Sequence, residues 1–415
     1  IVEDYFYRET HRQIFRAISE LSEQGQPIDA VTVADWFARN NLLDRVDGGA
    51  YVTMLANDTP GPANVTGYAE IVREKSVLRQ LIEIGTEVAD LALNPSGQSS
   101  RELLETAEQK MFAIAEQGAR GRKGYEHVKP LMSKAYNLIS ELFEKQEDIT
   151  GVASGFAELD KRTAGLQPTD LIIVAGRPAM GKTTFAMNIA TSAAVKKKVP
   201  VAVFSMEMSS LQLVFRLFSS LGQIHQNTLR TGKLSDNDFI KLTSAMEILK
   251  DTNILIDDTP ALSPVDLRAR ARRMKREHGI GLILIDYLQL MQVPGNKENR
   301  ATEIAEISRS MKALAKELEV PVIALSQLNR ALEQRPNKRP VMADLRESGS
   351  IEQDADLILF IYRDEVYNED SPDKGTAEII IGKHRNGATD DFKLAFQGEY
   401  LRFRDYTDDR YGLDN

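Results

Sequence analysis

The chain has 415 residues, of which 42% are hydrophobic and 27% are charged, as in ordinary globular proteins, so a disordered chain is excluded. A single core rarely organises a chain of this length, and two domains with a linker are therefore expected. Cysteine is absent and the five histidines are scattered, which argues against disulfides, thiolate chemistry and a zinc site. No run of 18 apolar residues occurs, so no membrane-spanning helix is expected.

The net charge of −9 is unevenly distributed along the chain. Residues 1–118 contain 10 Lys and Arg against 19 Asp and Glu, whereas residues 119–415 contain 42 of each kind. The whole acidic excess therefore lies in the first part of the chain. A local basic surface further along remains compatible with nucleic-acid binding, because binding depends on where charge lies and not on its total.

Residues 1–118 predict an all-α domain. Apolar residues of His11–Glu23 recur at three- and four-residue spacing, which is typical of one helix face. Val72–Leu93 and Arg101–Glu116 predict two longer helices, separated by a turn at residues 94–97. This part of the chain has no catalytic constellation, which favours a bundle that makes contacts.

Residues 119–150 predict a linker that contains one amphipathic helix. Gln117–Gly124 is rich in Gly, Arg and Lys and has no periodicity, whereas residues 128–143 place apolar side chains along a single stripe. An isolated helix of this kind is marginally stable unless the stripe is buried. The residues leave open whether it packs on its own domain or on a neighbouring subunit.

From residue 151 to residue 415, short apolar runs alternate with helical segments. This alternation predicts an α/β domain with a mostly parallel sheet and right-handed crossovers. The expected strands are 170–175, 199–206, 253–257, 282–288, 321–326, 355–362 and 377–382, followed by an antiparallel edge hairpin at 392–396 and 400–404.

Gly176–Thr183 fits the phosphate-binding pattern GxxxxGK[ST], between an expected strand and the expected helix Thr183–Ala194. The glycines let the backbone wrap a phosphate, and the helix N-terminus adds a positive dipole end. Lys182 is expected to reach the β- and γ-phosphates, and the Thr183 hydroxyl to bind Mg²⁺. The expected nucleotide-binding residues are Gly176, Arg177, Pro178, Ala179, Met180, Gly181, Lys182, Thr183 and Thr184.

Three other expected strands end in polar side chains, at the edge where open α/β sheets bind ligands. Asp286 is expected to hold Mg²⁺ and its water shell. Glu207 is a candidate for orienting and deprotonating an attacking water, and Gln327 for contacting the γ-phosphate or that water. For Glu207 and Gln327, an ordinary solvated position at a strand end remains the alternative.

Further along, cations occur in two short motifs. Lys383 and Arg385 flank His384 just before a turn. An arginine that reaches a γ-phosphate, often from another subunit, stabilises the charge of the transition state, although a basic hairpin tip is the alternative. Arg346, in the expected loop Asp344–Ile351, is a candidate contact for a nucleic-acid phosphate. The arginine-rich run Arg268–Arg276 predicts a solvated outer helix.

Taken in order, these motifs resemble the DnaB family of bacterial replicative helicases. The matching segments are GRPAMGKTTFAMNIA, FSMEMS, LILIDYLQLM, ALSQLNR, DLRESGSIEQDADLILFIYRDE and KHRNG, and EDYFYRETHRQIFRAI resembles the family's N-terminal domain. The resemblance covers essentially the whole chain, and DLRESGSIEQDAD and SQLNR are its specific parts. A few dozen residues that usually precede EDYFYRE are expected to be missing, and the chain begins with Ile1.

The resemblance implies a homohexameric ring of RecA-like P-loop NTPase domains, residues 151–415, under a collar formed by residues 1–118. The linker helix would dock on the adjacent subunit, and ATP with Mg²⁺ would bind between subunits. Single-stranded DNA would pass through the ring, and the protein would move along that strand from 5′ to 3′. Primase and a helicase loader are the implied partners, and the cytoplasm is the implied location.

The resemblance also assigns roles to individual positions. Lys182 and Thr183 would bind phosphate and Mg²⁺, and Asp286 would be the acidic metal residue. The remaining assignments are Glu207 as catalytic base, Gln327 as γ-phosphate sensor, Arg385 with Lys383 as the cations that reach the neighbour's site, and Arg346, Glu347 and Gly349 as the loop that holds the DNA strand.

Two other functions are compatible with the ATPase motifs alone. A RecA-like strand-exchange protein would share the ATPase core and form filaments on DNA, but it gives no reason for a long helical collar. A non-unwinding ATPase switch that scaffolds protein partners would leave the loop around Arg346 without a role on DNA.

Overall fold

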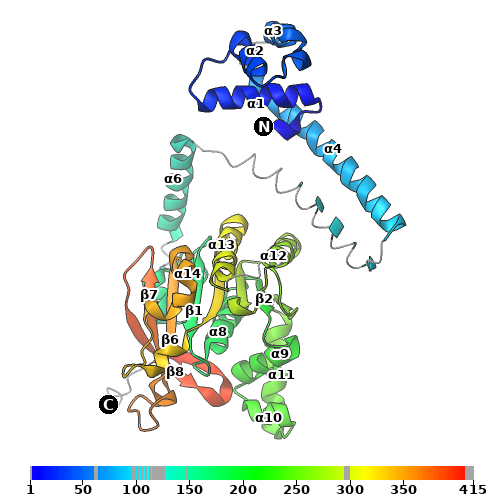
Figure 1. Ribbon diagram of the computed structural model, residues 1–415. Coiled ribbons are helices and arrows are strands. Elements are labelled where there is room, and N and C mark those ends of the chain that lie inside the picture. The colour runs from blue at the N-terminus through cyan, green and yellow to red at the C-terminus, as the bar shows by residue number, and fades with distance from the viewer. Residues whose placement is uncertain are drawn as a thin grey trace. The chain divides into compact units, whose positions relative to one another are not determined.

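The computed structural model describes residues 2–59, 64–95, 99–100, 127–145, 148–293 and 300–406, together with residues 103, 106, 107, 110, 111 and 114. For Lys145 and for residues 346–349 it describes the backbone and not the side chains. The chain divides into two compact units, Ile1–Ile139 and Ser140–Asn415 (Figure 1). Within the described residues, none of the helices combines the length and the apolar composition that crossing a bilayer requires.

The first unit is helical, as the sequence predicts. Its core is formed by six buried side chains: Ala17, Leu21, Val33, Phe37, Val46 and Val52. Asp29 caps one helix, because its carboxylate accepts the backbone N–H groups of Val31 and Thr32. The elements are η1 (Glu3–Tyr5), α1 (Glu9–Glu23), α2 (Ala30–Arg39), η2 (Leu43–Gly49), α3 (Ala50–Asp58) and α4 (Val65–Leu93).

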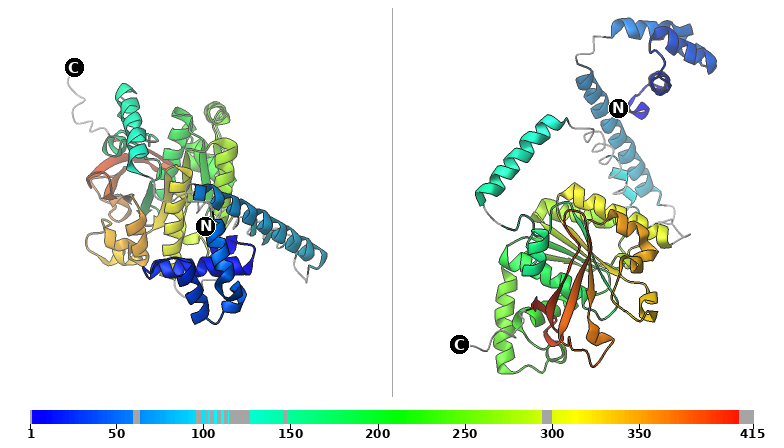
Figure 2. Two further views of the ribbon diagram at one scale, coloured as in Figure 1. Left: turned by 90° about the horizontal axis from the view of Figure 1, so that it is seen from above. Right: turned by 90° about the vertical axis from the view of Figure 1, so that its left-hand side faces the viewer.

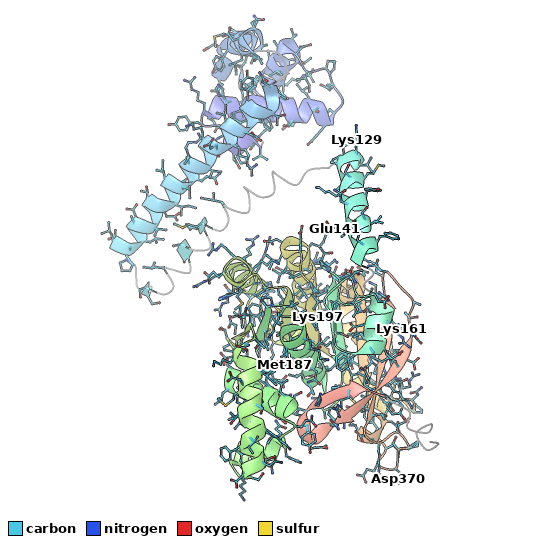
Figure 3. All side chains as sticks on the ribbon, turned by 180° about the vertical axis from the view of Figure 1, so that it is seen from behind. Lys129, Glu141, Lys161, Met187, Lys197 and Asp370 are labelled. Atoms are coloured by element: carbon cyan, nitrogen blue, oxygen red, sulfur yellow. The ribbon has the colours of Figure 1, made fainter. Side chains whose placement is uncertain are left out.

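The expected helix over residues 72–93 is present as α4 and begins earlier, at Val65. The expected helix Arg101–Glu116 falls largely outside the described residues, and the segment Gln117–Gly124 falls wholly outside them. The expected linker helix is present as α6 (Val128–Lys145), around Lys129 and Glu141 in Figure 3. Its apolar stripe is exposed at Val128, Leu131, Met132, Tyr136, Leu138, Ile139 and Phe143.

The second unit contains a nine-stranded sheet in the order β3-β2-β4-β5-β1-β6-β7-β8-β9. All nine expected strands are present, and the first six in this order pair in parallel. The strands are β1 (Leu171–Gly176), β2 (Val201–Ser205), β3 (Ile254–Asp257), β4 (Leu282–Asp286), β5 (Val322–Gln327), β6 (Leu357–Tyr362), β7 (Thr376–His384), β8 (Asp391–Gln397) and β9 (Arg402–Asp405).

Strand β7 differs from the expectation, because the alternating pattern grouped it with the parallel strands. It pairs antiparallel with β6, and β8 and β9 continue antiparallel at the edge. The physical reason is the connection: only a short 3₁₀ turn, η7 (Asp364–Val366), is assigned as helix between β6 and β7. A parallel return would need a longer crossover, usually an α-helix.

Helices cover both faces of the sheet (Figure 2). Along β1, Ile172 and Val174 join one apolar cluster with α8, whereas Ile173 joins a second cluster with α12 and α13. This two-sided burial explains why the central strands are almost continuously apolar. The helices are α7 (Ala157–Thr163), α8 (Lys182–Lys196), α9 (Ser210–Gly222), α10 (Gln226–Thr231), α11 (Asp236–Lys250), α12 (Pro264–His278), α13 (Arg300–Leu318) and α14 (Gly349–Asp354).

The segment Asp344–Ile351, which the sequence predicts as a loop, is helical. It is divided between the 3₁₀ helix η6 (Met342–Ser348) and α14. The solvated arginine-rich helix is present as α12, and several of its arginines pair with acids: Arg270 with Asp257, and Arg268 with Glu317.

Replacing a core side chain on α13 should destabilise the second unit far more than the same change on its surface. Ile307 is fully buried, and Ile240 on α11 is 67% exposed. Ile307→Ala should lower the free energy of unfolding by about 2–5 kcal/mol, and Ile240→Ala by less than about 0.5 kcal/mol. Urea denaturation followed by circular dichroism measures both, and equal shifts of the midpoint would contradict the assigned core.

Candidate functional site

The phosphate-binding loop joins the carboxyl end of β1 to the N-terminus of α8. Gly181 has a φ of 95°, and a Cβ there would lie 3.0 Å from Cζ of Phe403. A Cβ at Gly176 would lie 3.2 Å from the carbonyl oxygen of Ile361. Both glycines of the motif are therefore required by backbone conformation or close packing. The free N–H groups at the start of α8 then face the loop, an arrangement that suits a phosphate.

Lys182 begins α8 and lies over the loop, where its Nζ donates to the carbonyl oxygen of Arg177 at 3.2 Å. Burial lowers the pKa of Lys182 to about 8, and the nearby carboxylates of Asp286 and Glu207 oppose that shift. The ammonium is thus held in a partly buried position, where an anion would interact with it more strongly than in open solvent.

Thr183 and Asp286 form a hydroxyl–carboxylate pair between α8 and the end of β4. The Thr183 hydroxyl donates to Oδ2 of Asp286 at 2.9 Å, and Asp286 is only 3% exposed. Burial raises the pKa of Asp286 to about 6, against the Thr183 hydrogen bond, and the charge of Glu207 adds to the rise. One hydroxyl and one carboxylate are oxygen ligands of the kind that Mg²⁺ uses together with phosphates and waters.

No group of three or more His, Cys, Asp or Glu side chains that could hold a metal occurs among the described residues. The Thr183 hydroxyl and the Asp286 carboxylate are two adjoining oxygen donors, and a bound nucleotide would contribute further oxygens. The donor set of Thr183 and Asp286 therefore fits Mg²⁺ bound with a nucleotide.

Glu207 follows β2 and is exposed beside Asp286. Ser205 lies opposite Asp286 in the register of β2 and β4, so the ends of these strands adjoin. An exposed carboxylate at this point is accessible to a water molecule, which it could orient for attack.

Arg216 on α9 also belongs to this group, and the sequence analysis missed it. Burial lowers its pKa while Asp286 and Glu207 oppose the shift, and its buried Nε has no hydrogen-bond partner among the described residues. The signal in the sequence is its spacing: it lies three residues after Leu213 and directly before Leu217, both buried on the apolar face of α9. A charged residue on such a face needs a counter-charge nearby.

Gln327 lies beside the loop, because it pairs with Gly176 in the register of β1 and β5. Its backbone N–H donates to Oε1 of Gln289 at 3.3 Å, and Gln289 Nε2 donates to the Gln327 carbonyl at 3.2 Å. An open groove lined by Tyr287, Gln289, Gln327 and other residues extends from here to Asp344 in η6. The end of β5 is therefore connected to the segment that carries Arg346.

The side chains within the loop itself have different surroundings. The Arg177 guanidinium pairs with Glu333 at 2.7 Å and donates to the Leu328 carbonyl at 2.8 Å. It is thus engaged with the connection after β5, which leaves its backbone for a nucleotide. Met180 and Thr184 are buried, and Arg363 supports the loop by donating to the Ala179 carbonyl at 3.0 Å.

Lys383 and Arg385 are not brought to this site within one chain. His384 pairs with Leu357 on β6, and Leu357 pairs with Ile172 near the start of β1. The loop begins at the other end of β1, at Gly176, and the strand between these two levels is roughly 13 Å long at about 3.3 Å per residue. The two cations therefore lie near the amino ends of the parallel strands, whereas Lys182 of the same chain lies at their carboxyl ends.

Arg346, Glu347 and Gly349, the candidate DNA contacts, lie in η6 and at the start of α14. Their side-chain positions fall outside the described part of the structure. The neighbouring Asp344 is buried and pairs with Arg335 at 2.7 Å.

A glycine-rich phosphate loop, a Thr–Asp pair with a buried carboxylate and polar strand ends on a parallel sheet define a P-loop nucleotide-hydrolysing domain. Comparison with known proteins gives the family. The model for the DnaB-like helicase N terminal domain matches residues 1–74, and the model for the DnaB-like helicase C terminal domain matches residues 151–405. The chain therefore belongs to the DnaB-like helicase family.

Individual relatives agree with this assignment. The chain is 51% identical to the replicative DNA helicase DnaB of Pasteurella multocida, over 99% of this chain and 89% of the relative. It is 50% identical to that of Haemophilus influenzae, over 99% of this chain and 90% of the relative. A solved DnaB-like replicative helicase, described with its interactions with primase, has a TM-score of 0.78 at 31% identity, covering 98% of this chain and 94% of that one.

A second solved structure, described as an ATPase domain, has a TM-score of 0.65 at 37% identity and covers 68% of this chain and 100% of its own. Its similarity identifies the second unit as an ATPase domain of this family.

Nucleotide binding without metal should weaken as the pH rises through about 8. The reason is that Lys182 is charged below its pKa of about 8 and neutral above it, whereas the nucleotide phosphates are fully ionised throughout pH 7.5–9.5. Fluorescence titration with a labelled adenine nucleotide in EDTA measures this. Lys182→Arg should bind with little pH dependence over the same range, because the guanidinium stays charged. Equal pH dependence of both proteins would contradict the role of Lys182.

Proposed function

We propose that this chain is an ATP-dependent replicative DNA helicase that works as a homohexameric ring. The observation that carries the proposal is the division of the site between the two edges of the sheet. Lys182 and Asp286 lie at one edge and Arg385 lies at the other. An arginine so placed acts on a γ-phosphate only from another copy of the chain, and a closed ring supplies one such contact to every subunit.

ATP is the proposed nucleotide, and Mg²⁺ is the proposed metal. The backbone of residues 176–184 and the Lys182 ammonium would surround the β- and γ-phosphates. The Thr183 hydroxyl and the Asp286 carboxylate would hold the metal, which when bound supplies positive charge to the phosphate oxygens. The fit of this donor set to Mg²⁺ supports the assignment.

For hydrolysis, Glu207 is proposed to orient and deprotonate the attacking water. Gln327, beside the loop, is proposed to contact the γ-phosphate and to pass its loss to η6 through the adjoining groove. Arg385, with Lys383, would neutralise the charge that develops on the phosphate in the neighbouring subunit. An arginine of this kind increases kcat by a factor of about 10³–10⁵.

The proposed domains are a collar of residues 1–118, a linker of residues 119–150 and a motor of residues 151–415. The exposed apolar stripe of α6 supports a linker that docks on the adjacent subunit. Arg346, Glu347 and Gly349 are proposed to hold the backbone of single-stranded DNA, which lets the ring move along any sequence.

The direction of movement, 5′ to 3′, and the partners belong to the same proposal. Primase is supported by the similar DnaB-like helicase that is described with its primase interactions. A helicase loader is proposed as a second partner, and work at a bacterial replication fork would place the protein in the cytoplasm.

Mixing two inactive variants should restore ATP hydrolysis. Glu207→Gln keeps Arg385, and Arg385→Ala keeps Glu207, so a mixed ring contains interfaces with both groups intact. About a quarter of the interfaces should be intact in an equal random mixture, because each of the two required subunits is present with a probability of one half. Steady-state ATPase assays on subunits mixed before ring assembly measure the recovery.

Each variant alone should be reduced at least about 100-fold. Glu247→Gln, at an exposed position on α11, is the control. It should hydrolyse ATP at the wild-type rate, alone and in mixtures. Absence of recovery at every mixing ratio would contradict a site that is shared between two chains.

Arg346→Ala should weaken binding of single-stranded DNA and lower its dependence on salt, because one phosphate contact is lost. ATP hydrolysis without DNA should stay at the wild-type rate. Fluorescence anisotropy with oligonucleotides at several salt concentrations, together with unwinding of forks labelled on either strand, measures affinity and direction. Arg276→Ala, exposed on α12, is the matched control. Unchanged unwinding by Arg346→Ala would remove the DNA role of this segment.

A further inference from the structure

The two cations proposed for the neighbour's site are both held at the junction between α14 and β6. Nζ of Lys383 donates to the carbonyl oxygens of Glu352 at 2.5 Å and Gln353 at 3.3 Å. Arg385 donates from its backbone N–H to the carbonyl of Asp356 at 2.8 Å and from Nη1 to Oδ1 of Asp356 at 3.2 Å. We call these acceptors, the two carbonyls and Asp356, the cation seat.

Asp356 is the fixed part of the cation seat. Its Oδ2 accepts the backbone N–H of Leu171 at 2.8 Å and pairs with the Lys312 ammonium. Its backbone N–H donates to the Leu171 carbonyl at 2.9 Å. The side chain of Asp356 is 5% exposed, whereas that of Arg385 is 54% exposed. A buried, fully bonded carboxylate thus presents its remaining oxygen to a largely exposed guanidinium.

This arrangement allows Arg385 to leave the seat reversibly. A buried carboxylate that loses its last cation becomes an unpaired charge, which is strongly destabilising. Asp356 avoids this state, because Lys312 and the Leu171 N–H remain on Oδ2 when Oδ1 is released. The backbone bond from Arg385 to Asp356 also keeps the end of the strand in place while the side chain moves.

We propose that Asp356 is a positioning residue for catalysis in trans: it orients the Arg385 guanidinium toward the nucleotide of the adjacent subunit. The inference rests on the proposed function and adds to it a residue at the opposite edge of the sheet from its own phosphate loop. Its loss should therefore slow the neighbour's site and leave nucleotide binding at its own site unchanged. A purely structural role, through Leu171 and β1, would instead impair its own loop.

Asp356→Asn keeps the size of the side chain and removes its charge. We expect kcat for ATP to fall about 10- to 100-fold, as when a catalytic group is misplaced by about 1 Å, with an unchanged Kd for nucleotide. Asp390→Asn is the matched control, because Asp390 is an exposed carboxylate that pairs with Arg162 at 2.8 Å, close in sequence to Arg385. It should keep wild-type turnover.

Subunit mixing separates the two roles of Asp356. If Asp356 positions Arg385, mixing Asp356→Asn with Glu207→Gln restores activity, because one subunit supplies Glu207 and the other supplies a seated Arg385. Mixing Asp356→Asn with Arg385→Ala restores no activity. Both variants impair the arginine that a subunit supplies to its neighbour, so no subunit in the mixture supplies an intact one. If Asp356 instead acts on its own loop, the two mixtures exchange their results. Any pattern other than the first, or full activity of Asp356→Asn alone, overturns the inference.

Thermal unfolding checks that Asp356→Asn is folded. If it is not, Asp356→Glu replaces it in the same mixtures. Asp356→Glu keeps the charge paired with Lys312 but displaces the oxygen that contacts Arg385. The mixture of Glu207→Gln with Arg385→Ala is run in parallel. Failure of that mixture overturns the shared site itself. Its success, with reversed results for the Asp356 mixtures, overturns only the positioning role.

Discussion

The parallel strands of a sheet have their carboxyl ends on the same side, whereas the carboxyl end of an antiparallel strand lies on the opposite side. This constraint separates the polar groups of the second unit into two sets. Glu207, Asp286 and Gln327 follow or end β2, β4 and β5 and gather around the phosphate loop. Arg385 follows β7, which runs the other way, so it lies level with the start of β1. The short connection through η7 forces this reversal. If Arg385 acts on a γ-phosphate as proposed, the complete site needs two chains.

Electrostatics explains why the phosphate side of this divided site is poised for a nucleotide. Burial lowers the pKa of Lys182 to about 8 and raises that of Asp286 to about 6, so each group is close to losing its charge. Burial also lowers the pKa of Arg216, and the carboxylates of Asp286 and Glu207 oppose that shift. A phosphate chain with its metal would supply the missing counter-charges in a place where screening by water is weak. The pocket thus stores unfavourable desolvation that ligand binding relieves.

The sequence predicts the strands and the phosphate loop well, because both depend on local patterns. Apolar runs that are buried on both faces and a glycine pattern between strand and helix leave few alternatives. It fails where the determinant is tertiary. The direction of β7 depends on its partner. The helical state of residues 344–351 depends on packing beside α13, which no periodicity reveals in so short a segment.

The site was predictable to the same extent. Residues at strand ends could be placed near the loop, since parallel strands share an edge. Arg216 was missed because it lies within an ordinary amphipathic helix, and Asp356 because its partners, Lys312 and Leu171, are distant in sequence. Residues joined only by the fold carry no spacing that a motif can capture.

The exposed stripe of α6 and the divided site pose the same physical requirement. An isolated helix of this length is marginal in water, and full burial of a single large apolar side chain contributes about 1.5–3 kcal/mol. Burial of the seven exposed side chains of α6 can therefore stabilise both the helix and an association. If the surface that buries them belongs to the adjacent copy, the contact that orders the linker also fixes that copy in place. Arg385 is then delivered by the same association, so catalytic competence and assembly depend on one interface.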